Sequence, residues 1–160
     1  MFFAVAAAVS CSQPPATAPQ APASDPATLM ETVDIASHSG QSFEAFTKSA
    51  GMERFGLEKL DLSPDERARV IQNMAISQPS RLISGGGAEA LVFLGCARGG
   101  CADGLAVLAF GNHGETFVGV HDAAGTEQFI PDDRMEALLR LNSAARRWDD
   151  PETARPEAKP

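Results

Sequence analysis

The 160-residue chain has no tyrosine, one tryptophan, three histidines and three cysteines, and it carries few basic side chains. Its 13 lysines and arginines stand against 21 aspartates and glutamates, for a formal net charge of −8. Phosphate contacts need clustered Lys and Arg, so this balance argues against nucleic acid as a partner. It is compatible with a basic protein partner, because opposite charge steers association.

Local motifs of catalysis and cofactor binding are also missing. The glycines at 85–87 are not followed by the Lys-Ser/Thr pair of a phosphate-binding loop. Serine, histidine and aspartate form no triad-like local motif, and His121 beside Asp122 is typical of a strand end rather than a catalytic dyad. We interpret Trp148 as core or rim of the domain. We therefore expect no enzymatic activity and no cofactor.

Residues 1–11 form a short apolar run that ends in small residues and a cysteine. The run is too short to span a bilayer and is typical of an export signal. Ala8–Cys11 resembles a bacterial lipobox, although Ala8 replaces the usual leucine and no basic residue precedes the run. We predict that Cys11 is lipidated, which accounts for the odd cysteine; the alternative is a plain signal peptide. Ser12 is compatible with anchoring in the outer membrane of a Gram-negative bacterium, facing the periplasm.

Composition then divides the rest of the chain. Residues 12–29 are rich in Pro, Ala, Ser and Thr, with Asp25 as their only charge, and such a segment cannot bury enough apolar surface to order itself. We expect a disordered, extended tether that holds the domain away from the membrane. Residues 149–160 are Pro-rich and charged, and predict a disordered tail. One folded domain remains, at residues 30–148.

Two helices are predicted ahead of the sheet. Residues 42–51 predict a short helix with Ser42 as its N-cap and Gly51 at its end. Its apolar face comprises Phe43, Phe46 and Ala50. Residues 62–77 predict a longer helix that ends before Pro79. Its N-terminus has a capping box of Ser63 and Glu66, with Pro64 at the first helical position. Its apolar stripe comprises Val70, Ile71, Met74 and Ala75.

The middle of the chain predicts an antiparallel sheet. Residues 90–95 and 105–110 are continuous apolar runs, which indicates strands covered on both faces. Their connection is too short for a helical crossover, so they pair antiparallel. Residues 112–114 predict a turn and 115–122 a third strand, and we expect a short fourth strand around Phe129.

A last helix is predicted at 131–148. Asp132 and Asp133 lie near its start and Arg146 and Arg147 near its end, as the helix dipole favours. Its inward face comprises Met135, Leu138, Leu139 and Leu141. A sheet that is apolar on both faces needs a helix layer on each side, so we predict an α+β domain with α/β/α layers.

The stretch "CARGGC", from Cys96 to Cys101, allows four interpretations. A disulfide across a tight hairpin would be structural and contribute roughly 2 kcal/mol. Zinc ligation lacks a second Cys/His pair with finger spacing, and thioredoxin-type catalysis uses a different cysteine spacing. In the fourth interpretation the hairpin is a preorganised recognition loop. Arg98 would then form a bidentate pair with a carboxylate, while Gly99 and Gly100 allow close backbone approach.

Around this loop the sequence resembles the Ivy family, the inhibitors of vertebrate lysozyme. The resemblance rests on the Phe-containing helix "SFEAFTKSAG", an apolar strand, the Cys-x4-Cys loop, and "CADGLAVLAF" followed by a Gly-containing strand. It covers about residues 38–122, and more loosely extends to 148. It implies an antiparallel sheet flanked by helices, a periplasmic protein without enzymatic activity, and the ability to form a homodimer. It also implies a Cys96–Cys101 disulfide in a loop that enters the active-site cleft of a c-type lysozyme.

The loop departs from the family pattern at every position between its cysteines. The family's loop reads Cys-Lys-Pro-His-Asp-Cys, and its histidine meets the catalytic carboxylates of the enzyme. Here the inner positions are Ala97, Arg98, Gly99 and Gly100. Either Arg98 replaces the histidine, or the target is another carboxyl-dependent enzyme, such as a lytic transglycosylase of the host cell. We predict an inhibitor of lysozyme-type, peptidoglycan-cleaving glycosidases; the alternative is a noncatalytic envelope lipoprotein with a purely structural disulfide.

Overall fold

The computed structural model describes residues 32–142 and Asp149. The predicted export signal at 1–11 with Cys11, the tether at 12–29 and the tail at 149–160 apart from Asp149 lie outside the described residues. Arg146, Arg147 and Trp148 lie outside them as well. Nearly all of the predicted folded domain is therefore described. No helix within 32–142 is long and apolar enough to cross a membrane.

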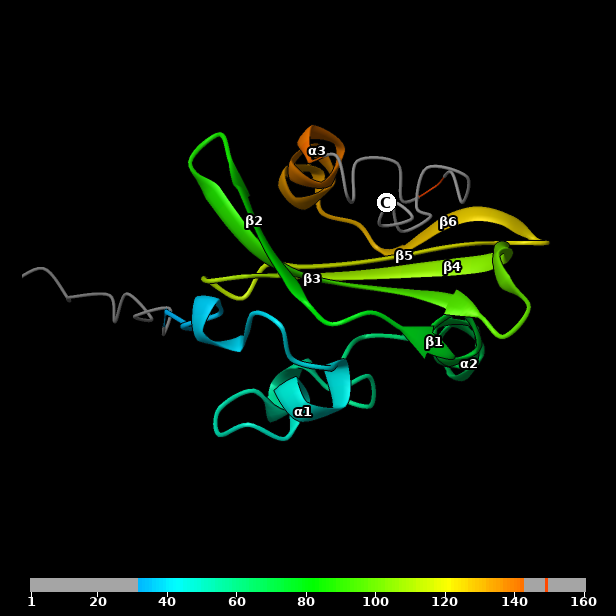
Figure 1. The fold of residues 1–160 in the computed structure, drawn as a ribbon, viewed down its shortest axis with the longest axis horizontal. Coiled ribbons are helices and arrows are strands. Elements are labelled where there is room, and N and C mark those ends of the chain that lie inside the picture. Colours follow the sequence, from blue (N-terminus) through cyan, green and yellow to red (C-terminus); the bar gives the residue numbers. More distant parts are fainter. Residues whose placement is uncertain (1–31, 143–148, 150–160) are drawn as a thin grey trace, which may run out of the picture.

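The centre of the fold is a six-stranded antiparallel sheet (Figure 1). Its strands are β1 (Ile76–Ser77), β2 (Arg81–Gly85), β3 (Ala88–Ala97), β4 (Gly100–Gly111), β5 (Thr116–Asp122) and β6 (Gly125–Ile130). The order across the sheet is β1-β3-β4-β5-β6, and β2 pairs with the other half of the β3 edge. The predicted antiparallel pairing is confirmed. The strand expected around Phe129 is also confirmed, as part of β6.

Helices cover both faces of the sheet, as the uninterrupted apolar runs predict. The helices α1 (Phe43–Thr47) and α2 (Pro64–Asn73) lie on one face, and α3 (Asp133–Leu141) lies on the other (Figure 1). Along β3, Leu91 and Phe93 belong to the core beneath α1 and α2, whereas Val92 and Leu94 belong to the core beneath α3. Alternate residues thus enter two cores, which is why the strand shows no polar face. The α+β class with α/β/α layers is confirmed.

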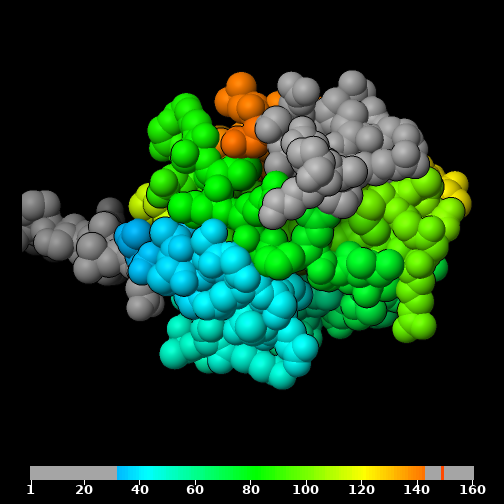
Figure 2. Space-filling view, in the orientation of Figure 1, coloured from blue at the N-terminus to red at the C-terminus, as the bar shows by residue number. Residues whose placement is uncertain are grey.

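The larger core is built on phenylalanine. The ring of Phe46 is fully buried and lies 5.2 to 5.6 Å, between ring centroids, from three other phenylalanine rings. These rings belong to Phe55, Phe93 and Phe110. Two 3-10 helices, η1 (Ala36–His38) and η2 (Glu53–Phe55), flank α1 and complete this layer, which is coloured blue to cyan in Figure 2. A five-residue helix has little stability of its own, so these contacts hold α1 in place.

The predicted helix caps are present. Ser42 accepts a hydrogen bond from the backbone of Ala45, and Ser63 and Glu66 form a reciprocal capping box at the start of α2. At α3, the Asp132 carboxylate accepts hydrogen bonds from two backbone N–H groups of the first turn. Each cap satisfies donors that a helix cannot pair internally.

Some sequence predictions about the helices are wrong. The helix predicted over 62–77 ends at Asn73, because the chain turns there into the edge strand β1. The first helix ends at Thr47, short of Ala50. The side chains predicted to be buried but in fact exposed are Ala50, Ile71, Ala75 and Leu141. The edge strands β1 and β2 are short and mostly exposed or half-exposed, and the sequence did not predict them.

Candidate functional site

The stapled loop is a two-residue turn followed by a bulge. Ala97 pairs with Gly100 across the β3–β4 hairpin, so only Arg98 and Gly99 lie between the paired residues. Gly100 has a φ of +117°, a conformation that glycine adopts without the strain of a Cβ atom. Register then shifts: Cys96 pairs with Leu105, which leaves residues 101–104 of β4 without partners in β3. The turn itself is therefore short, and the four additional residues of the connection form a bulge in β4.

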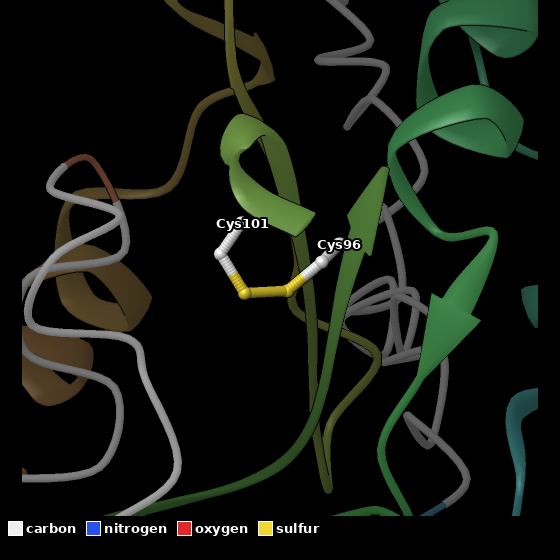
Figure 3. Close-up of a disulfide and its surroundings, with 2 residues drawn as sticks. All are labelled: Cys96 and Cys101. Atoms are coloured by element: carbon white, nitrogen blue, oxygen red, sulfur yellow. A yellow bond between two sulfur atoms is a disulfide. The ribbon is translucent and has the colours of Figure 1, made fainter. Parts of the chain in front are cut away.

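A disulfide joins the bulge to the strand beside it. Cys96 and Cys101 are bonded, with 4.5 Å between their Cα atoms, and Figure 3 shows the bridge from the end of β3 to the start of β4. The disulfide is confirmed, and both sulfur atoms are used in it rather than as thiolate metal ligands. Since pairing already closes the turn at Ala97 and Gly100, the disulfide chiefly restrains the bulge. The turn and bulge are thus a preorganised unit.

The tip of this unit carries one unpaired cation. Arg98 is exposed, and within 32–142 and Asp149 it has no hydrogen-bond or ion-pair partner. Asp103, in the bulge, lies over Gly99: a Cβ atom built on Gly99 would meet the Asp103 carboxylate. Asp103 is also exposed, so its side chain has room to move. A guanidinium with free donors at a rigid tip is suited to a carboxylate acceptor on another molecule.

Helix α2 packs beneath the bulge, on the face of the sheet that α3 does not cover. Asn73 is 2% exposed, and its amide donates to the backbone carbonyl of Arg69 and to the carboxylate of Asp122. The approach to the sheet is close, because a Cβ atom on Gly104 would lie 1.8 Å from the Asn73 amide oxygen. The absence of a side chain at Gly104 therefore lets the last turn of α2 pack directly beneath the bulge.

An ion-pair network fixes α2 to the strands beyond the bulge. Arg69 donates two hydrogen bonds to Asp122, at 3.1 and 3.0 Å, and a third to Glu127 on β6. Its guanidinium also lies 5.0 Å from the centroid of the Phe129 ring. The main cause of a lowered pKa at Asp122 is its hydrogen bonding to Arg69, which stabilises the charged carboxylate. The same partners raise the pKa of Arg69.

This network predicts an acid-sensitive contribution to stability. Because the pKa of Asp122 is lower in the folded than in the unfolded chain, its contribution is present above the ordinary value of 3.8 and is lost as pH falls through the folded value. We expect Arg69→Met to lower the free energy of unfolding by about 2 kcal/mol at pH 7. The difference from the parent should shrink below about pH 4.

Urea unfolding at pH 7 and pH 3 measures both quantities. Lys48→Met is the control, since Lys48 and Glu44 form an exposed pair whose removal leaves the urea midpoint almost unchanged. An equal loss for Arg69→Met at both pH values would show that packing over Phe129, and not the charge on Asp122, carries the effect.

The histidine next to this network has a different partner. His121 Nδ1 lies 2.7 Å from the hydroxyl oxygen of Thr126, while the neighbouring Asp122 is bound by Arg69 and Asn73. The two adjacent side chains therefore belong to separate interactions. Among residues 32–142 and Asp149, no three His, Cys, Asp or Glu side chains are placed to hold a metal ion.

A concave region lies at the end of the sheet opposite the stapled loop. It is a cleft of about 500 Å³ between the β2–β3 turn, the β4–β5 turn and the start of α3. Charged groups of both signs line it, among them Glu89, Glu115 and Arg134. Arg134 and Glu115 approach each other at 3.9 Å, and the Glu115 carboxylate also accepts the backbone N–H of His113. Some of the charged groups in the cleft therefore already have partners within it.

Sequence reasoning located the loop but missed its support. The cysteine spacing and the Gly-rich composition of residues 97–100 were sufficient to identify the candidate site. Arg69 and Asn73 lie on α2 with no local motif, and only tertiary contacts bring them to Asp122. The one signal was their i, i+4 spacing, which places polar side chains on the helix face next to Val70.

No family model, no curated protein and no solved structure matches this chain.

Proposed function

We propose that this protein is an exported inhibitor that binds lysozyme-type, peptidoglycan-cleaving glycosidases through the Cys96–Cys101 loop. The observation that carries the proposal is Arg98, exposed at the tip of a disulfide-restrained turn and without a partner in the part of the chain that the structure describes. The resemblance to the Ivy family around the same loop supports it. Disulfide formation is favoured in the oxidising periplasm, where such enzymes act on the cell wall.

The chemistry of the target explains why an arginine suits this position. Lysozyme depends on two carboxyl groups that flank the scissile bond, and lytic transglycosylases also use a carboxyl acid in a sugar-binding cleft. A guanidinium matches a carboxylate in a bidentate geometry, and a charged pair removed from water is stronger than one at the surface. Because the turn is already ordered, little conformational entropy is lost on binding. Gly99 and Gly100 add no side-chain bulk to the tip of the loop.

The target is a c-type lysozyme or a lytic transglycosylase of the host cell. The family's histidine is replaced in this loop, so the proposal assigns its role to Arg98, one position earlier. Lipidation of Cys11 would place the inhibitor at the outer membrane of a Gram-negative bacterium, where both kinds of enzyme meet peptidoglycan. The remaining alternative is a noncatalytic envelope lipoprotein in which the disulfide has only a structural role.

Arg98→Ala tests the proposal. The full chain carrying Cys11→Ser, which keeps the protein unlipidated and leaves only the paired cysteines, is titrated against a c-type lysozyme and a lytic transglycosylase. We expect inhibition of at least one, and about a 10- to 100-fold weaker inhibition by Arg98→Ala, because a charge-assisted bidentate pair is lost. The urea midpoint should stay unchanged, since Arg98 has no partner within 32–142 or at Asp149.

Arg134→Ala is the matched control, because this arginine is 68% exposed and lies at the other end of the sheet. It should inhibit as the parent does. If neither enzyme is inhibited by the parent, the proposal fails and the structural role of the disulfide is favoured. If Arg98→Ala inhibits as well as the parent, the loop is not the contact.

A further inference from the structure

An exposed isoleucine lies beside the disulfide. Ile76 begins the two-residue edge strand β1 and pairs directly with Cys96. It is 54% exposed, although a large aliphatic side chain is usually buried. Residues directly opposite each other in an antiparallel pair place their Cβ atoms about 5 Å apart on the same face of the sheet. Ile76 is therefore a direct neighbour of the disulfide.

The face of the sheet that carries this pair follows from strand alternation. Val92 and Leu94 point into the core beneath α3, so Cys96, two residues further on, shares their face. Cys101 packs against the same core. Helix α3 lies toward the other end of this face, where its Leu138 would be 3.3 Å from a Cβ atom on Gly85. Within 32–142, α3 therefore leaves the Ile76 side of the disulfide accessible, as the exposure of Ile76 records.

The other exposed large aliphatic side chains within 32–142 lie elsewhere. Ile71 is 57% exposed on α2, the helix that covers the opposite face of the sheet. Leu141 ends α3 and approaches Gly85, far from the disulfide. Single exposed aliphatic residues of this kind are common and need no partner. Ile76 differs because it adjoins a disulfide whose Cys101 is only partly buried, next to a turn whose Arg98 has no partner among residues 32–142 and Asp149.

We infer that Ile76 and the Cys96–Cys101 disulfide, together with Arg98, form one binding surface, here named the Ile76 surface. The inference rests on the proposed function and extends it: while Arg98 meets a carboxylate, Ile76 covers an apolar or aromatic side chain at the rim of the same enzyme cleft. Ligand-binding clefts combine apolar and aromatic walls with a few polar groups, which matches a cation beside an aliphatic side chain. The aliphatic contact excludes water around the charged pair and so strengthens it.

Because β1 is an edge strand, a partner can reach the side chain of Ile76. The strand lies at the margin of the sheet, the backbone N–H of Gln78 just beyond it still donates to Leu94 on β3, and Pro79 follows directly. A proline near a short edge strand opposes extension of the sheet by a foreign strand. The partner is therefore expected to contact the side chain of Ile76 rather than to pair with its backbone.

Ile76→Thr and Ile71→Thr form a matched pair for the test. Both changes replace a half-exposed isoleucine by a smaller, polar, β-branched residue, which retains strand propensity at Ile76. Dissociation constants for the lysozyme and the transglycosylase are measured with the Cys11→Ser chain, and urea midpoints confirm folding. We expect about three- to tenfold weaker binding for Ile76→Thr. This corresponds to losing roughly half of the free energy gained when an isoleucine side chain is buried. We expect no change for Ile71→Thr.

Each outcome separates the inference from the proposed function. Weaker binding by Ile76→Thr alone supports the Ile76 surface. Unchanged binding by Ile76→Thr, with the loss at Arg98→Ala intact, overturns the Ile76 surface and leaves the loop as the contact. Equal weakening by Ile76→Thr and Ile71→Thr also overturns it, because the effect is then not local to the disulfide. A parent chain that binds neither enzyme overturns both.

Discussion

Phe46→Ala is expected to lower the free energy of unfolding by about 4 kcal/mol, the largest effect of any change considered. The ring of Phe46 is fully buried and contacts three other phenylalanine rings, so its removal leaves a cavity that rigid neighbours fill poorly. It is also the one fully buried side chain of α1, and losing it frees that short helix from the sheet. Urea unfolding followed by circular dichroism measures the change.

Ile71→Ala provides the comparison for Phe46→Ala. Ile71 is 57% exposed, so its truncation should change the free energy of unfolding by less than about 0.5 kcal/mol. A loss below about 1.5 kcal/mol for Phe46→Ala would contradict the described core, because it would mean that the ring is not enclosed by the other three.

Gly95→Ala is expected to cost about 3 kcal/mol. A Cβ atom at Gly95 would lie 2.7 Å from the backbone Cα of Met74 and 2.6 Å from its sulfur, so the end of α2 would have to move away from β3. Overpacking of this kind usually costs about 1–3 kcal/mol, and a backbone contact places it at the upper end. The displaced helix turn also carries Asn73, so we expect a shift in the amide NMR signals of Asp122 as well.

Gly99→Ala is the matched control for Gly95→Ala. Its Cβ atom would meet only the end of the Asp103 side chain, which is exposed and can rotate away. We expect a change of less than about 1 kcal/mol in unfolding free energy. A similar loss at both glycines would mean that the turn is more tightly packed than its exposure indicates.

Local sequence signals predicted the elements whose stability depends on nearby residues. Ser63, Pro64 and Glu66 specify the start of α2 through hydrogen bonds within one helical turn, and the structure places the cap there. The apolar runs at 90–95 and 105–110 have no polar alternation, which indicated cover on both faces. The disulfide was an expectation for the same reason, since its cysteines are five residues apart in the chain.

Contacts between distant segments explain why the buried face of α2 was predicted wrongly and why β1 and β2 were not predicted. The stripe of α2 was assigned from apolar residues alone, but the helix buries Val70 together with the polar Asn73 and leaves Ile71 in solvent. Asn73 can be buried because Asp122, 49 residues away, accepts its amide hydrogen bond. Similarly, β1 and β2 are too short to be recognised from their own residues, and they are strands because β3 offers its edge to both.

The sequence by itself determined the α+β layers, the position of the stapled loop and the identity of its single cation, because periodicity, caps and cysteine spacing are local properties. The tertiary structure decided that the loop is a two-residue turn with a bulge, that α2 supports the bulge through Asn73 and Arg69, and that Ile76 lies beside the disulfide. These features depend on strand register and on the close approach of α2 to Gly95 and Gly104. Register and helix docking are set by packing over the whole sheet, so no short segment encodes them.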